Sequence, residues 1–225
     1  DSLGIVGVKP LYQSKLGGLL VYLPKRDKVK LLIQVANYDF RWGGLGSNIR
    51  IGTVSAIMNS LHVKNGFDLF FIGSLLTMSL YLVTMYFLYR EGYSFLYLSM
   101  ICLAVALRTS TTESSSLFLP ALLPNFGWAL WKKIEFFSVY SVVAFFPLYV
   151  SCVFPKESSK KVDLFFVVVA FLLCSIVLIT SHSIYVLALD VCHVGLLLGF
   201  VYACIVSIKA WRKKNSDAKT LFFGI

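Results

Sequence analysis

Residues 66–89, GFDLFFIGSLLTMSLYLVTMYFLY, decide the fold of this chain. Residues 69–88 of this stretch contain no charged side chain. A helix of about twenty residues rises about 30 Å, which is the thickness of the hydrocarbon core of a bilayer. The stretch therefore predicts a membrane-spanning helix. It divides the sequence into a first part with β-like runs and polar turns and a second part that is mostly apolar.

The composition of the chain indicates an integral membrane protein. Apolar residues make up 58% of the 225 residues and charged residues only 14%, whereas soluble domains contain about 25% charged residues. A net charge of +10 could indicate nucleic-acid binding in a soluble protein, but in a multi-span chain basic residues act first as topology signals. We therefore expect the lipid bilayer, and no nucleic acid, as a partner.

Residues 1–64 are predicted to form the C-terminal part of an all-β sandwich domain. Pro- and Gly-rich turns separate four β-like runs, at residues 3–8, 16–23, 29–36 and 48–54. Short runs with this punctuation are typical of antiparallel sandwiches. Because 64 residues supply too few strands to close a sandwich, we expect its opening strands to precede Asp1.

Residues 65–225 are predicted to form a multi-pass α-helical membrane bundle. The uncharged part of the second span is short, so we expect either Arg108 to snorkel at its end or the helix to continue through the following Ser/Thr residues. Residues 117–131 contain two prolines and are expected to lie along the membrane interface. The predicted spans are about 67–89, 93–109, 133–153, 162–180 and 183–208, and a sixth begins near Leu221.

The basic residues predict the orientation of the bundle. One set of loops carries nine of them: Arg90, Lys156, Lys160, Lys161, Lys209, Arg212, Lys213, Lys214 and Lys219. The opposite set carries three: Arg108, Lys132 and Lys133. Because cytoplasmic loops are enriched in Lys and Arg, we expect the first set in the cytoplasm and the β domain outside.

Residues 31–45, LLIQVANYDFRWGGL, followed by IRIG at 49–52, resemble the end of the second type of extracellular domain in the bacterial seven-transmembrane receptors with diverse intracellular signalling modules. The membrane part is similar to the same family. The similar segments are 73–90, 95–108 with Thr112 and Glu113, and 134–136.

The resemblance implies a jelly-roll-like periplasmic domain joined to helices in the bacterial inner membrane. It implies a transmembrane sensor that detects a carbohydrate or another small ligand outside and signals to a cytoplasmic module, in cis or in trans, such as a kinase, cyclase or phosphatase. The alternative is a multi-pass transporter or channel subunit. Inverted repeats would be typical of that class, and the two halves of the sequence share no similarity.

Ionisable residues in the fifth span predict a candidate site. Asp190 and His193 lie three residues apart and hence on one helical face, and such groups within a membrane usually face the bundle interior. They could form one intramembrane polar cluster with other residues of the outer half, namely Arg108, Glu113, Glu135 and His182. The cluster either senses a ligand, a proton or the docked β domain through a helix shift, or only fixes helix packing.

Other patterns each allow two interpretations. Gln34, Asn37 and Arg41 could contact a ligand in the β domain, or Asn37 could form an Asx turn. The small residues Gly195 and Gly199 favour close packing within the bundle, or a homodimer. The basic run 209–215 either anchors the topology or binds anionic headgroups.

The sequence contains no pattern typical of catalysis or cofactor binding. The five cysteines lie in apolar runs without a CxxC pair, so we expect neither a disulfide framework nor a metal site. The loop at 43–46, GGLG, lacks the Lys-Ser/Thr ending of a phosphate-binding loop and is predicted to be a turn between strands. We therefore expect no enzyme activity within this chain and no cofactor.

Overall fold

The computed structural model describes residues 21–23, 32–33, 49–89, 92–112, 123 and 127–212. Each of the helices in these ranges is long and apolar enough to cross a membrane. The helices are α1 (Val54–Tyr89), α2 (Ser94–Thr111), α4 (Trp128–Val153), α5 (Lys160–Ile179) and α6 (His182–Arg212). They confirm the predicted helical membrane bundle, while most of the predicted β domain and the span near residue 221 lie outside the described residues.

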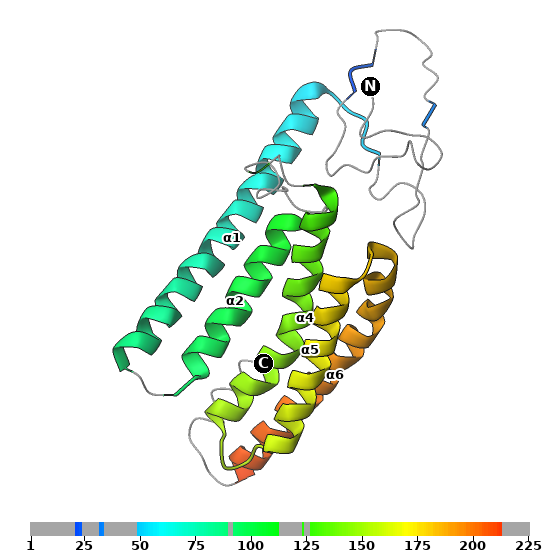
Figure 1. Cartoon of the computed structure of the whole chain (residues 1–225). Coiled ribbons are helices and arrows are strands. Elements are labelled where there is room, and N and C mark those ends of the chain that lie inside the picture. Colours follow the sequence, from blue (N-terminus) through cyan, green and yellow to red (C-terminus); the bar gives the residue numbers. More distant parts are fainter. Residues whose placement is uncertain are drawn as a thin grey trace.

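The helices lie side by side, and each runs opposite to the one before it (Figure 1). α1 packs on α2, α2 packs on α4, and α4 also packs on α5 and α6. Half of the apolar membrane-spanning stretch of α4 is therefore buried within the bundle, against 17% of the corresponding stretch of α1. We call the end of the bundle with the α4–α5 turn the basic end, because it carries Lys156, Lys160, Lys161, Lys209 and Arg212; the opposite end, with Trp128 and His182, is the aromatic end.

α1 begins earlier than the sequence analysis predicted. Residues 49–53 are not in a strand and Val54 begins the helix, so the prediction of a β-like run over 48–54 is wrong for these residues. Thr53 starts the helix: its hydroxyl oxygen accepts the backbone N–H of Ala56 at 3.3 Å, and its carbonyl accepts that of Ile57 at 3.0 Å. A 36-residue helix is about 54 Å long, so α1 is longer than a bilayer is thick.

α2 confirms one of the two predicted alternatives, and the start of α4 differs from its predicted span. α2 continues through the Ser/Thr residues to Thr111, and the Thr109 and Ser110 hydroxyls are satisfied by carbonyls one turn earlier in the same helix, at 2.9 and 2.7 Å. Trp128 and Trp131 belong to the first turns of α4 and not to a separate interfacial segment. Trp131 is buried, so tertiary packing supports this early start.

The main apolar core lies between α4, α5 and α6. It contains Tyr140, which has no exposed surface, together with Val143, Phe166 and Tyr185. The Tyr140 hydroxyl donates a 2.6 Å hydrogen bond to the Tyr185 carbonyl oxygen of α6. A buried hydroxyl without a partner would be unfavourable, so this bond lets a tyrosine occupy the core and ties α4 to α6.

Two serines join α1 to α2. Ser79 and Ser99 are buried, their hydroxyl oxygens lie 2.9 Å apart, and the Ser99 hydroxyl donates to the Ser79 carbonyl at 3.0 Å. Hydrogen bonds between helices are a common contact in bilayers, where helix faces gain little from the hydrophobic effect. This pair fixes the register of the long α1 against its neighbour.

Gly195 and Gly199 are buried on α6 where it approaches α4. A Cβ atom added at Gly195 would lie 3.1 Å from Val143 Cγ1, and one at Gly199 would lie 3.4 Å from Pro147 Cγ. Both glycines therefore serve packing within the bundle, the first of the two interpretations of this motif.

We predict that Gly195→Leu destabilises the bundle by about 1–3 kcal/mol, because the added atoms overpack the contact with Val143. Gly73→Leu on α1 is the matched control, since no atom lies within 4 Å of a Cβ added there. Thermal unfolding of both variants in detergent, followed by tryptophan fluorescence, checks the prediction. An equal midpoint for Gly195→Leu and Gly73→Leu would contradict it.

Candidate functional site

A first polar cluster joins α2 to α4 near the aromatic end. Glu135 Oε2 accepts a hydrogen bond from Lys132 Nζ at 3.0 Å, and the two side chains are only 12% and 5% exposed. Glu135 Oε1 lies 3.2 Å from the hydroxyl of Thr112, the residue directly after the last residue of α2. We call Thr112, Lys132 and Glu135 the α2–α4 cluster.

The Thr112 hydroxyl has two alternative acceptors. Besides Glu135 Oε1 it lies 2.8 Å from the Arg108 carbonyl oxygen of its own helix. A threonine has one hydroxyl hydrogen, so it can donate to only one of the two at a time. The bond between helices can thus be exchanged for a bond within α2 without leaving the hydroxyl unpaired.

His182 brings the start of α6 to the same end of α4. Its ring is buried and stacks on Trp128, with centroids 4.8 Å apart and planes inclined by 12°. The ring of Phe136, the residue after Glu135, packs edge to face against the His182 imidazole, with ring centroids 5.9 Å apart. The Tyr185 ring centroid lies 5.0 Å from the His182 ring centroid. At the aromatic end, Glu135 of α4 therefore contacts the end of α2, and the next residue, Phe136, contacts the start of α6.

The other residues of the predicted polar cluster have different surroundings. Arg108, Asp190 and His193 are exposed on α2 and α6. Glu135, by contrast, is nearly buried and is held by Lys132 and Thr112.

Four predicted site residues lie outside the described part of the chain: Gln34, Asn37, Arg41 and Glu113. Their assignments remain predictions. In the ranges that the structure describes, no three or more His, Cys, Asp and Glu residues are grouped so that they could hold a metal ion.

A second polar cluster joins α4, α5 and α6 near the basic end. The Ser151 hydroxyl of α4 donates to Asp163 Oδ1 at 2.6 Å, and the Tyr202 hydroxyl of α6 lies 3.4 Å from the same oxygen and 3.2 Å from Ser151 Oγ. The Tyr202 oxygen also accepts the Ser159 backbone N–H at 3.0 Å. We call Ser151, Ser159, Asp163 and Tyr202 the α4–α5–α6 cluster.

The position of Asp163 in its helix stabilises this cluster. The residue lies in the first turn of α5, where the positive end of the helix dipole favours a carboxylate. Sequence reasoning missed the cluster, because Ser151 and Tyr202 are polar residues within apolar spans far apart in the chain. The available signal was the acidic residue two positions after Lys161 at the start of a span.

One known family matches this chain. The family model described as 7TM diverse intracellular signalling matches residues 64–225, which include most of α1 and the whole of α2, α4, α5 and α6. Comparison with curated proteins and with solved structures gave no match.

We predict that Tyr202→Phe destabilises the chain by about 1–3 kcal/mol, because the Ser159 N–H loses its acceptor and Asp163 loses a donor. Tyr149→Phe on α4 is the matched control, since the Tyr149 hydroxyl makes no hydrogen bond within the described residues. Thermal unfolding in detergent measures both variants. The assignment fails if Tyr202→Phe is as stable as Tyr149→Phe.

Proposed function

The chain belongs to the 7TM diverse intracellular signalling family, and we propose that it is the transmembrane sensing part of a receptor in a bacterial inner membrane. In this proposal the residues before α1 lie in the periplasm and take part in binding a small ligand, with carbohydrates as the first class to test. A cytoplasmic module, in cis or in trans, provides the output. Catalysis belongs to that module and not to this chain.

The basic residues support this orientation. The basic end carries five Lys and Arg residues in the described ranges: Lys156, Lys160, Lys161, Lys209 and Arg212. Around the connection between helices at the other end lie Arg108, Lys132 and Lys133, and Arg50 and Lys64 lie before and within the first part of α1 at that end. Counted over the connections between helices, a cytoplasmic basic end satisfies the positive-inside rule, and α1 then begins outside the membrane.

α1 suits the role of an input element. Its first turns project beyond the aromatic ends of the other helices (Figure 1), and the helix is continuous from Val54 into the bundle. A displacement of the residues before it would therefore reach α2 through the Ser79–Ser99 contact.

The observation that carries the proposal is the double attachment of α4. The α2–α4 cluster holds α4 near one end, and the α4–α5–α6 cluster holds it near the other. Helix shifts of about 1–2 Å are a common form of switching. A shift of α4 would have to rearrange both clusters, so it would couple the aromatic end to the basic end.

We predict that a ligand of the receptor changes the distance between α1 and α4 at the basic end by about 1–2 Å. Spin labels at Tyr89→Cys and Pro155→Cys, in a background without the native cysteines, measure this distance in the full-length protein in nanodiscs. Mono- and oligosaccharides that raise the thermal unfolding midpoint are the ligands to test. The change should be smaller in Thr112→Val, which removes the hydroxyl that contacts Glu135.

Thr84→Val is the matched control, because within the described part of the chain the Thr84 hydroxyl bonds only to the Leu80 carbonyl of its own helix, at 2.9 Å. It should retain the full ligand response. A ligand that binds without changing the distance would contradict the sensing role. Accumulation of the ligand inside proteoliposomes would support the transporter alternative instead.

A further inference from the structure

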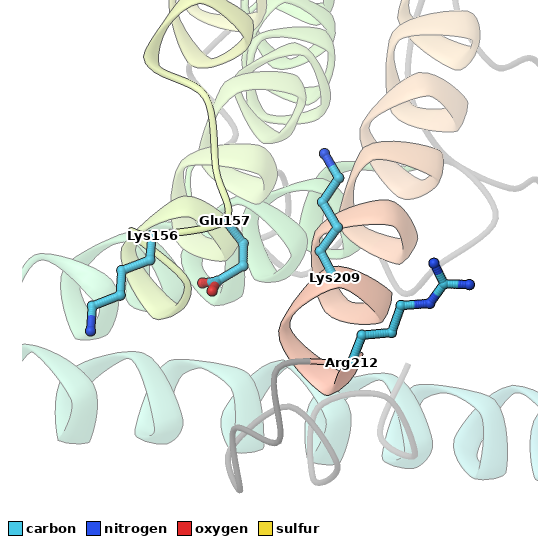
Figure 2. Close-up of a pocket in the computed structure, with 4 residues that line it drawn as sticks. All are labelled: Lys156, Glu157, Lys209 and Arg212. Atoms are coloured by element: carbon cyan, nitrogen blue, oxygen red, sulfur yellow. The ribbon is translucent and has the colours of Figure 1, made fainter.

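A hollow of about 390 Å³ opens at the basic end. Its lining residues are Lys156 and Glu157 from the α4–α5 turn and Lys209 and Arg212 from the last turn of α6. Figure 2 shows the two pairs on opposite sides of the hollow, with their charged ends apart from one another.

The fold holds the two sides of this hollow in place. Phe154, at the end of α4, is buried against Ala203, Val206 and other residues of α6. The next residues form a tight turn, in which the Glu157 and Ser158 N–H groups donate to the Phe154 carbonyl at 3.3 and 3.1 Å. Ser159 then bonds to Tyr202 of α6. The backbone of Lys156 and Glu157 is thus held close to α6.

Lys209 and Arg212 both line the hollow because residues three apart lie on one side of a helix, and their side chains extend in different directions from α6 (Figure 2). Their positive charges also oppose the partial negative charge at the carboxyl end of α6. With Lys156 they give three cationic groups against the single carboxylate of Glu157. The hollow therefore attracts anions, while Glu157 disfavours those with a high negative charge.

The surroundings are those of a membrane surface. The hollow lies at the ends of helices long enough to span a bilayer, and the neighbouring Ile208 and Trp211 are exposed apolar residues of α6. A basic pocket between helices, beside apolar side chains at headgroup level, is a typical place for the headgroup of an anionic lipid.

We propose that this hollow binds a phosphate group of low negative charge, carried either by an anionic lipid such as phosphatidylglycerol or by a soluble phosphate. The phosphate would bridge the α4–α5 turn and α6, next to the α4–α5–α6 cluster. The inference does not depend on the receptor proposal; it requires only that the basic end lies at a membrane surface.

We predict that Lys209→Gln/Arg212→Gln lowers the affinity for phosphatidylglycerol about tenfold or more, since each basic residue near a membrane surface contributes about 1 kcal/mol. Native mass spectrometry of the detergent-purified chain, titrated with phosphatidylglycerol or with phosphatidylcholine of the same acyl chains, measures the binding. Lys160→Gln/Lys161→Gln is the matched control: it removes two positive charges from the same end but none from the hollow. It should retain the wild-type affinity.

A parallel titration with inorganic phosphate separates the two sources of the phosphate group. Displacement of phosphatidylglycerol by millimolar phosphate would identify a soluble phosphate as a sufficient ligand, and retention of the lipid would identify the headgroup. Equal losses in the two double variants, or equal binding of phosphatidylcholine, would overturn the proposal. If Lys209→Gln/Arg212→Gln does not fold, Lys156→Gln in the exposed turn tests the same hollow and should also weaken binding.

Discussion

The packing of α4 against α2, α5 and α6 is the constraint on which the rest of this bundle depends. In a bilayer, helices gain little from burying apolar side chains, because lipid is equally apolar. Association must then come from close contact and from hydrogen bonds between helices. α4 provides both: Val143 and Pro147 fit against the glycines of α6, and Tyr140 bonds to the α6 backbone within a core that excludes lipid.

The polar contacts form a series along the order of the helices. Ser79 and Ser99 join α1 to α2, Thr112 and Glu135 join α2 to α4, and Asp163 joins α4 to α5 and α6. Hydrogen bonds between membrane helices contribute only about 0.6–2 kcal/mol each. Their main effect is therefore to fix the register of neighbouring helices, which an apolar interface alone specifies poorly.

The sequence predicted the spans well, because about twenty uncharged residues have few structural alternatives. It failed at the start of α1, where Ile49, Ile51 and Val54 alternate as in a strand while Thr53 in fact begins a helix. Glu135 was singled out as an ionisable residue near a span, but its contact with Thr112 requires two helices to meet. The Asp163 contacts could not be predicted for the same reason, since no local pattern relates residues 151, 163 and 202.

The two kinds of contact differ in how easily a signal could change them. A ligand that binds one arrangement a hundredfold more tightly than another supplies about 2.7 kcal/mol, which is enough to exchange one or two hydrogen bonds between helices. It is too little to rebuild a core in which removal of a single large side chain typically costs about 2–5 kcal/mol. The Thr112 hydroxyl, with its second acceptor in the Arg108 carbonyl, can change partner at still lower cost. Any switching of this bundle should therefore take place in the polar clusters near the two ends of α4, while the core around Tyr140 and Val143 moves as a unit.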